Sequence, residues 1–421
     1  MRARSLILIA AALLALAADA GPRRRAVGKP TSDLTPAGWL TRNAHVLESS
    51  ELVPFSFDLE PLRPMIGSAG IVAIGDGTHG TREFYTMKLR VIDFMVREMG
   101  FDVVAFEAPF PVMNRVNAYV QGGAGDAHEL IGELRDLNYF FWDAEELVEV
   151  VERMREYNAH RGERPPVHIA GFDVFAPVDA SQEVLKYLRA IDPTAAAVAE
   201  GEYSCISEGT YTISGACVDA ATRVRDALAS RETELAALSS ATAFHDALHN
   251  ARVVVQSGSA NSVRRDDSMA ANTLWLREHR GASRKMILWA HNAHVSKAAN
   301  EWARDRPMGK TLAATLGNDL FVIATLTAAG SFRQWDPGAT SHKISTFPPL
   351  QPTSIESYIR QRGMPRLLIP LRGVLPTWLS NEAPYNSAAG TGAPGLTESL
   401  PEHYDAAIFI DTTTPLTELK N

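Results

Sequence analysis

The chain has 421 residues, of which 46% are hydrophobic and 21% charged. These values exclude a largely disordered or coiled-coil protein, and the length favours two domains or one large domain with an insertion. The formal net charge is −8, whereas broad nucleic-acid binding requires clustered positive charge. We therefore expect no nucleic-acid partner.

Residues 1–20 have the pattern of a secretory signal peptide. Arg2 and Arg4 precede an apolar stretch at residues 6–18, and small residues follow at Ala18 and Ala20. The apolar stretch is too short to cross a bilayer core of about 30 Å, so cleavage is favoured over a membrane anchor. We therefore expect an exported protein, periplasmic or secreted, with no stable membrane association. Residues 21–36 should then form a flexible leader.

The alternation of apolar runs and helical patterns begins near residue 37. Short β-branched runs bounded by turn residues predict buried strands at residues 71–74, 103–106, 167–170, 286–289, 320–325, 366–371 and 407–410. Apolar residues at spacings of three and four predict helices at residues 82–99 and 144–157. The alternation predicts an α/β fold with a largely parallel sheet flanked by helices.

Residues 178–272 differ from the rest of the chain. They are rich in alanine and have helical periodicity without a convincing strand. We interpret them as a helical insertion or cap in an α/β catalytic domain made of residues 37–177 and 273–421. Cys205 and Cys217 lie in a polar stretch of this segment. In an exported protein they favour a disulfide, worth about 3 kcal/mol by loop closure, over two free thiols.

Four of the predicted strands end in residues that can perform acid–base chemistry. These residues are Asp76 with His79, Glu107, Asp173, and His291 with His294. Ligands of open α/β sheets bind at the carboxyl ends of the strands, so parallel neighbours would bring the six side chains into one cleft. Each residue alone could be a helix cap or a buried core residue, but the set predicts a site.

His79 lies in the turn GDGTHG, directly before the helix predicted at residues 82–99. The partial positive charge of a helix N-terminus disfavours imidazolium, so His79 is the candidate general base. Asp76 or Glu107 could orient it and stabilise the cation that forms during proton transfer.

The helix after this turn carries further candidates. Lys88 and Arg82 point to different faces, and either could stabilise an oxyanion or bind an anionic group. We assign Lys88 to the catalytic group, and Arg82, Glu83 and Asp173 to substrate binding. A solvated helix face is the alternative for Glu83.

The chain has no G-x-S-x-G sequence, which argues against a nucleophile-elbow serine hydrolase, and no H-E-x-x-H sequence. His291 and His294 could help to bind a metal, or could supply an acid and an oxyanion donor without one. We favour metal-free hydrolysis and expect no cofactor, with a metal-dependent hydrolase as the alternative. An exported protein that binds haem or another small ligand is a third reading, but three carboxylates suit acid–base work better.

Several motifs together resemble the erythromycin esterase family. In the family's order they are GDGTHGTREF at 75–84, FEA at 106–108, RVNAYV at 115–120, GFD at 171–173, RDDSMA at 265–270 and LWAHNAHV at 288–295. The resemblance extends over about residues 64–331. It implies an α/β-type hydrolase with a helical portion and a small-molecule ester or lactone substrate.

Members of this family open the ring of erythromycin-like macrolides with water activated by a histidine. The resemblance makes His79 that base, makes His291 and His294 the second histidine pair, and matches Glu107 and Lys88 to acidic and basic positions. Asp76 departs from the pattern, because the family usually has a longer glutamate there. The expected protein is an exported carboxylic ester hydrolase that forms no covalent acyl-enzyme, with a macrolide as the leading substrate.

Overall fold

The computed structural model describes residues 35–136, 141–258, 262–281, 283, 285–300, 306–336, 341–386 and 396–419. The expected signal peptide and nearly all of the expected leader lie outside these residues, so both stay predictions. Every helix in the described part is too short or too polar to cross a membrane.

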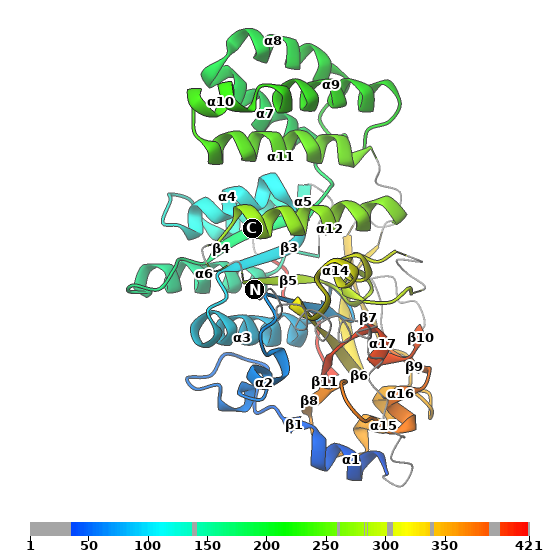
Figure 1. The fold of residues 1–421 in the computed structure, drawn as a ribbon. Coiled ribbons are helices and arrows are strands. Elements are labelled where there is room, and N and C mark those ends of the chain that lie inside the picture. Colours follow the sequence, from blue (N-terminus) through cyan, green and yellow to red (C-terminus); the bar gives the residue numbers. More distant parts are fainter. Residues whose placement is uncertain are drawn as a thin grey trace, which may run out of the picture.

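A mostly parallel sheet forms the centre of the described chain, with strands in the order β1-β8-β11-β6-β2-β5-β3-β4 and β7 paired to β6 (Figure 1). Its strands are β1 His45–Val46, β2 Ile71–Asp76, β3 Val103–Pro109, β4 His168–Asp173, β5 Met286–His291, β6 Leu320–Asp336, β7 Ser341–Thr346, β8 Arg366–Pro370 and β11 Ala406–Thr413. The run from β11 to β4 is parallel, whereas β8, β1 and β7 pair antiparallel with their neighbours. A separate ribbon consists of β9 (Ala383–Tyr385) and β10 (Leu396–Glu398).

The predicted α/β fold is confirmed, and each predicted strand is present. The strands are buried on both faces, with Val72 and Ile74 packed in one core layer and Ile71 and Ala73 in the other. This explains why they read as continuous apolar runs rather than as alternating patterns. The sequence did not predict β7, whose residues are mostly exposed and polar.

Helices cover both faces of the sheet. Outside the segment between β4 and β5 they are α1 Pro36–Asn43, α2 Leu62–Ile66, α3 Arg82–Met99, α4 Phe110–Val120, α5 Ala127–Asp136, α6 Glu145–His160, α13 Asn292–Val295, α14 Met308–Leu316, α15 Ile355–Arg360, α16 Thr377–Ser380 and α17 Leu400–His403. Short 3-10 turns are η1 Phe57–Leu59, η2 Tyr203–Cys205 and η3 Gly317–Asp319. Helix α3 has the predicted bounds, and Gly100 ends it with a φ of 72° that favours glycine.

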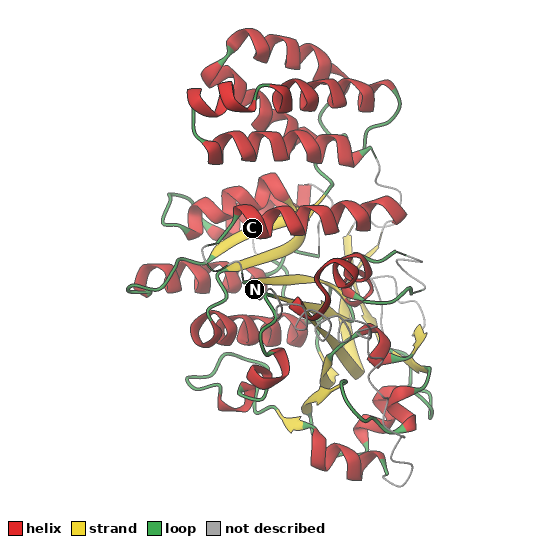
Figure 2. Cartoon of the chain, viewed as in Figure 1, coloured by secondary structure: helices red, strands yellow, loops and turns green. Residues whose placement is uncertain are grey.

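The segment between β4 and β5 consists of helices joined by loops in its described residues, with no strand among them (Figure 2). Its helices are α7 Pro177–Ile191, α8 Pro193–Glu202, α9 Ala216–Ser230, α10 Glu232–Leu238, α11 Ala241–Ser257 and α12 Ser262–His279. Helices α7 to α11 form one end of the molecule, whereas α12 packs against β4. The predicted disulfide between Cys205 and Cys217 is present. Helix α12 extends beyond residue 272 and packs against the sheet. The boundaries of an insertion at residues 178–272 stay a prediction.

Candidate active site

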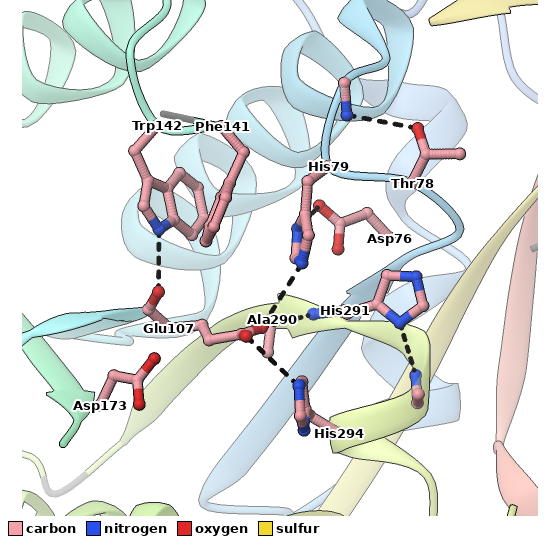
Figure 3. Close-up of polar contacts among 12 residues, drawn as sticks. Asp76, Thr78, His79, Glu107, Phe141, Trp142, Asp173, Ala290, His291 and His294 are labelled. Carbon is pink, nitrogen blue, oxygen red and sulfur yellow. Dashed lines mark hydrogen bonds and ion pairs between the residues drawn. The ribbon is translucent and has the colours of Figure 1, made fainter. Parts of the chain in front are cut away.

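The acidic and histidine side chains gather at the carboxyl edge of four neighbouring parallel strands. Asp76, His291 and Asp173 end β2, β5 and β4, and Glu107 lies near the end of β3. Asp76 and His291 are direct partners in the register of β2 and β5. Figure 3 shows these side chains around His79, which belongs to the turn after β2.

Two glycines allow the main chain of this turn to pack closely. A Cβ on Gly75 would lie 2.2 Å from Oδ1 of Asn292, whose Nδ2 donates to the carbonyl oxygen of Thr325 at 2.9 Å. A Cβ on Gly80 would lie 1.7 Å from the carbonyl oxygen of Arg333, and the Arg333 N–H donates to the Gly80 carbonyl at 2.8 Å. The glycines therefore let the turn settle against α13 and β6, which fixes the position of the intervening histidine.

His79 stands between two carboxylates and is only 8% exposed. Its Nδ1 lies 3.4 Å from Oδ2 of Asp76, and its Nε2 lies 3.9 Å from Oε2 of Glu107. The ring stacks on Phe141 with centroids 4.4 Å apart and an angle of 18° between the planes. The stacking fixes the plane of the imidazole, so that one nitrogen faces each carboxylate.

Asp76 and Lys88 form a fully buried pair behind His79. The Lys88 Nζ lies 3.5 Å from Oδ2 of Asp76 and 4.7 Å from the centroid of the Trp289 ring. Burial alone would raise the pKa of Asp76, but Lys88 and then His79 lower it below its ordinary value. Burial lowers the pKa of Lys88 to about 8, against the opposing charge of Asp76. Lys88 therefore acts on the site as the counter-ion of Asp76.

Arg265 joins Glu107 to Asp173. Its Nη2 donates to Oε1 of Glu107 at 2.7 Å, and its Nε donates to Oδ1 of Asp173 at 2.9 Å. Burial would raise the pKa of Glu107, but the charges of His294 and then Arg265 hold it well below its ordinary range. Asp173 is fully buried and also accepts from the Val174 N–H at 2.7 Å. Asp173 thus holds Arg265 in place.

The histidines after β5 differ in charge. His291 is buried, and burial lowers its pKa to about 3, so the ring is neutral. Its Nδ1 accepts from the Ala293 N–H at 3.2 Å, which places its proton on Nε2. Burial lowers the pKa of His294, but Asp266 and Glu107 outweigh this and raise it to about 9. His294 Nδ1 lies 2.8 Å from Oδ1 of Asp266, and Nε2 lies 3.3 Å from Oε1 of Glu107. A protonated ring can donate to both carboxylates at neutral pH.

We expect the contribution of His294 to the stability of the protein to fall between pH 6.5 and 7.5. The folded protein keeps the His294 proton up to pH 9, whereas an unfolded histidine releases it near pH 6.5. This stabilisation is therefore complete below pH 6.5 and is lost as the pH rises through 9. Measured as the difference between the wild type and His294→Gln, the free energy of unfolding should decline by about 1 kcal/mol across this window, because groups that titrate in both proteins, such as His291 and Lys88, cancel. Urea unfolding of the wild type and of His294→Gln at the two pH values measures this difference. The same decline in both proteins would contradict the assignment.

Two of the predicted substrate-binding residues, Arg82 and Glu83, lie apart from this cluster, and their role in substrate binding stays a prediction. Arg82 donates to Glu51 at 2.7 Å and lies 3.4 Å from Glu146. Glu83 accepts hydrogen bonds from the Thr414 N–H and hydroxyl, both at 2.7 Å. Helical geometry explains the difference, because the first turn of α3 faces the C-terminal segment, whereas Lys88 lies on its buried face.

The structure adds residues that the sequence reasoning did not assign to the site. Arg265 and Asp266 come from α12, and Phe141 and Trp142 precede α6. The Trp142 Nε1 donates to the Glu107 carbonyl at 2.8 Å. The motif RDDSMA at residues 265–270 is the sequence signal that could have indicated Arg265 and Asp266. It lies, however, in the segment that we interpret as an insertion.

One group of possible metal ligands among the described residues is separate from this cluster. It consists of Asp143, His342 and Glu418. Both carboxylate oxygens of Asp143 already accept from Arg135 at 2.8 Å, which leaves little negative charge for a metal. In the main cluster, Lys88 and Arg265 supply fixed positive charge beside the carboxylates.

The fold and this cluster define an α/β enzyme with a histidine–carboxylate site at the strand ends. The chain belongs to the erythromycin esterase family, whose model, described as Erythromycin esterase, matches residues 96–413. This confirms the resemblance and supports hydrolase activity. The match includes Glu107, His291 and His294 and begins after the His79 turn.

Two relatives and two solved structures illustrate the similarity. YbfO of Bacillus subtilis (strain 168), named for a suggested hydrolase activity, is 21% identical over 91% of this chain and 92% of its own. Erythromycin esterase type II of Escherichia coli is 24% identical over 65% of this chain and 72% of its own. A Bacillus cereus protein has a TM-score of 0.80 at 23% identity, covering 92% of this chain and 98% of its own. A mutant erythromycin esterase in its open conformation has a TM-score of 0.69 at 20% identity, covering 90% and 99%. The solved structures show a shared fold.

Proposed function

We propose that this protein hydrolyses a carboxylic ester or a macrolactone with water that His79 activates. The position of His79 between Asp76 and Glu107 is the observation that carries the proposal. The separation of 3.9 Å between His79 Nε2 and Glu107 is too long for a direct hydrogen bond. A water molecule bound between them would be held by both groups.

In the proposed reaction, His79 Nε2 takes a proton from this water, and the water oxygen attacks the carbonyl carbon. Asp76 stabilises the imidazolium that results, because it faces Nδ1. The carbonyl π electrons move to oxygen and form a tetrahedral oxyanion. When the oxyanion collapses, the ester C–O bond breaks, and the proton on His79 or His294 passes to the leaving alkoxide.

Positive charge beside Glu107 supports the second half of this mechanism. His294 is the protonated donor at neutral pH, and neutral His291 carries its proton on Nε2. Donors fixed in a buried site can stabilise a developing oxyanion without reorganisation. Water attack needs no acyl-enzyme, which agrees with the lack of a G-x-S-x-G sequence.

The leading substrate in this proposal is an erythromycin-like macrolide. The family and the name of the Escherichia coli relative support this choice. Asp76 is shorter by one methylene than the usual glutamate of the family, so its reach toward His79 differs. The separation of 3.4 Å between Asp76 and His79 still allows an electrostatic contact.

Export is part of the proposal. It is supported by the signal-like pattern at residues 1–20 and by the Cys205–Cys217 disulfide, because disulfides persist in oxidising compartments. The mass of the protein recovered from the medium or the envelope tests it. A mature chain that begins at Gly21 is expected, whereas a chain retaining residues 1–20 would contradict cleavage.

The activity test uses the purified mature protein and a panel of 14-membered and 16-membered macrolides and simple esters. Mass spectrometry should detect the addition of one water to at least one compound. A parallel incubation with a chelator separates the metal-dependent alternative, since activity that is lost there and restored by one divalent ion would favour a metal. A serine-reactive phosphonate should leave the protein unlabelled. Folded protein that hydrolyses nothing in the panel would contradict the proposed substrates.

A further inference from the structure

The loop closed by the Cys205–Cys217 disulfide reaches the ion-pair network of the proposed active site. Tyr211 of this loop stacks on Phe175 with ring centroids 4.2 Å apart and an angle of 18° between the planes. The guanidinium carbon of Arg265 lies 5.1 Å from the centroid of the same Phe175 ring. Phe175 thus contacts the loop and the arginine together.

We propose that Tyr211 is a positioning residue that holds Arg265 on Glu107 and Asp173 through Phe175. This inference rests on the proposed function for its kinetic consequence, but its structural part does not. An aromatic ring beneath a guanidinium restricts the planes that the guanidinium can adopt. Arg265 needs one plane, because its Nε and Nη2 bind the two carboxylate oxygens of Asp173 while Nη2 also donates to Glu107.

The backbone next to Phe175 has an unfavourable conformation, which is consistent with a position of Phe175 that the surrounding structure imposes. Ala176 has a φ of 73° and is the one non-glycine residue with positive φ among the described residues. This conformation is costly for a residue with a Cβ, and such residues concentrate at functional sites. This unfavourable conformation lies directly between Phe175 and the start of α7.

An open cavity lies on one side of this loop. A cavity of about 790 Å³ lies between it and α7, lined by Ala176, Leu185, Tyr203, Ile206 and Tyr211 among others. A segment beside an open cavity has fewer packing contacts that hold it in one conformation. The disulfide and the stack of Tyr211 on Phe175 therefore contribute more to the order of this loop. Ile213, which is 6% exposed, anchors the far side of the loop.

The disulfide also helps to hold Tyr211 against Phe175. It joins positions 12 apart and encloses Tyr211 within that short loop. Breaking it would allow the loop more conformations, and Tyr211 would then spend less time on Phe175. Reduction and loss of the Tyr211 ring should therefore disturb Arg265 in the same way.

The test compares Tyr211→Leu, Tyr211→Phe and the double variant Cys205→Ser/Cys217→Ser, with Tyr187→Leu as the control. Tyr187 lies in α7, and its hydroxyl donates to the Leu235 carbonyl at 3.1 Å, away from Arg265. The first readout is solvent exchange of the Arg265 Nε–H by NMR in ¹⁵N-arginine protein, assigned with Arg265→Lys. Exchange should quicken about tenfold in Tyr211→Leu and in the double variant, and should be unchanged in Tyr211→Phe and the control.

The second readout separates kcat from KM. Tyr211→Leu should lower kcat about fivefold to tenfold with KM within about twofold, whereas Tyr211→Phe should restore kcat. Unchanged exchange in Tyr211→Leu would overturn the inference. So would a higher KM with unchanged kcat, because Tyr211 would then contact the substrate. If the wild type hydrolyses no ester, the proposed function fails, but the exchange measurement still decides the positioning role.

Discussion

Replacing His79 with alanine should reduce hydrolysis by roughly a hundredfold to ten-thousandfold while the protein remains folded. A positioned general base contributes roughly a hundredfold to ten-thousandfold, and no other described side chain lies between Asp76 and Glu107 in the same way. The measurement is kcat/KM on whichever ester the protein hydrolyses, together with thermal unfolding.

The matched control for this change is His128→Ala. His128 is about half exposed and pairs with Glu145 at 3.1 Å, outside the cluster. It should retain full activity. If His79→Ala kept even a tenth of the wild-type turnover, His79 would not be the base, and the water would have to be activated by another group.

Replacing Asp76 with asparagine should damage both stability and activity. Lys88 would lose the carboxylate that faces it in a fully buried environment, and an uncompensated buried charge costs about 3–5 kcal/mol. His79 would lose the group that stabilises its cation, so kcat should fall roughly a hundredfold or more. Denaturant unfolding and steady-state kinetics measure the two effects.

A double variant separates these two roles of Asp76. Asp76→Asn with Lys88→Met removes both charges, so it should recover most of the stability while remaining inactive. Asp58→Asn is the control for a buried pair elsewhere, because Asp58 binds the buried Arg90 away from the site. It should lose stability but keep its kcat. An active double variant would show that Asp76 serves only to neutralise Lys88.

The three histidines of the site have different electrostatic environments, which suggests a division of labour. His79 lies between two carboxylates, His291 is neutral because it is buried, and His294 is charged because Asp266 and Glu107 flank it. Under the proposed function, a base, a neutral donor and a cationic donor can activate water, stabilise the oxyanion and protonate the leaving group. The lysine and arginine behind them balance the charge of the carboxylates.

The amino-acid sequence by itself determined the α/β fold and most of the residues at the strand ends. Strands buried on both faces must be apolar along their length, so β2, β3 and β5 are visible as short runs. Parallel strands end at one edge, so Asp76, Glu107 and His291 could be grouped before any contact was known. The disulfide could also be predicted, because the signal-like N-terminus indicates an oxidising compartment and the two cysteines are 12 positions apart.

Only the tertiary structure decided which charged groups meet. Arg265 lies 158 positions from Glu107 in the chain, and the packing of α12 against β4 brings them together. Arg82 and Lys88 have similar side chains on one helix, yet the first binds Glu51 while the second is buried beneath Asp76. A sequence pattern fixes the face of a helix but not the partner that this face meets. The charge of each histidine also depended on tertiary packing, since burial and neighbouring carboxylates set its pKa.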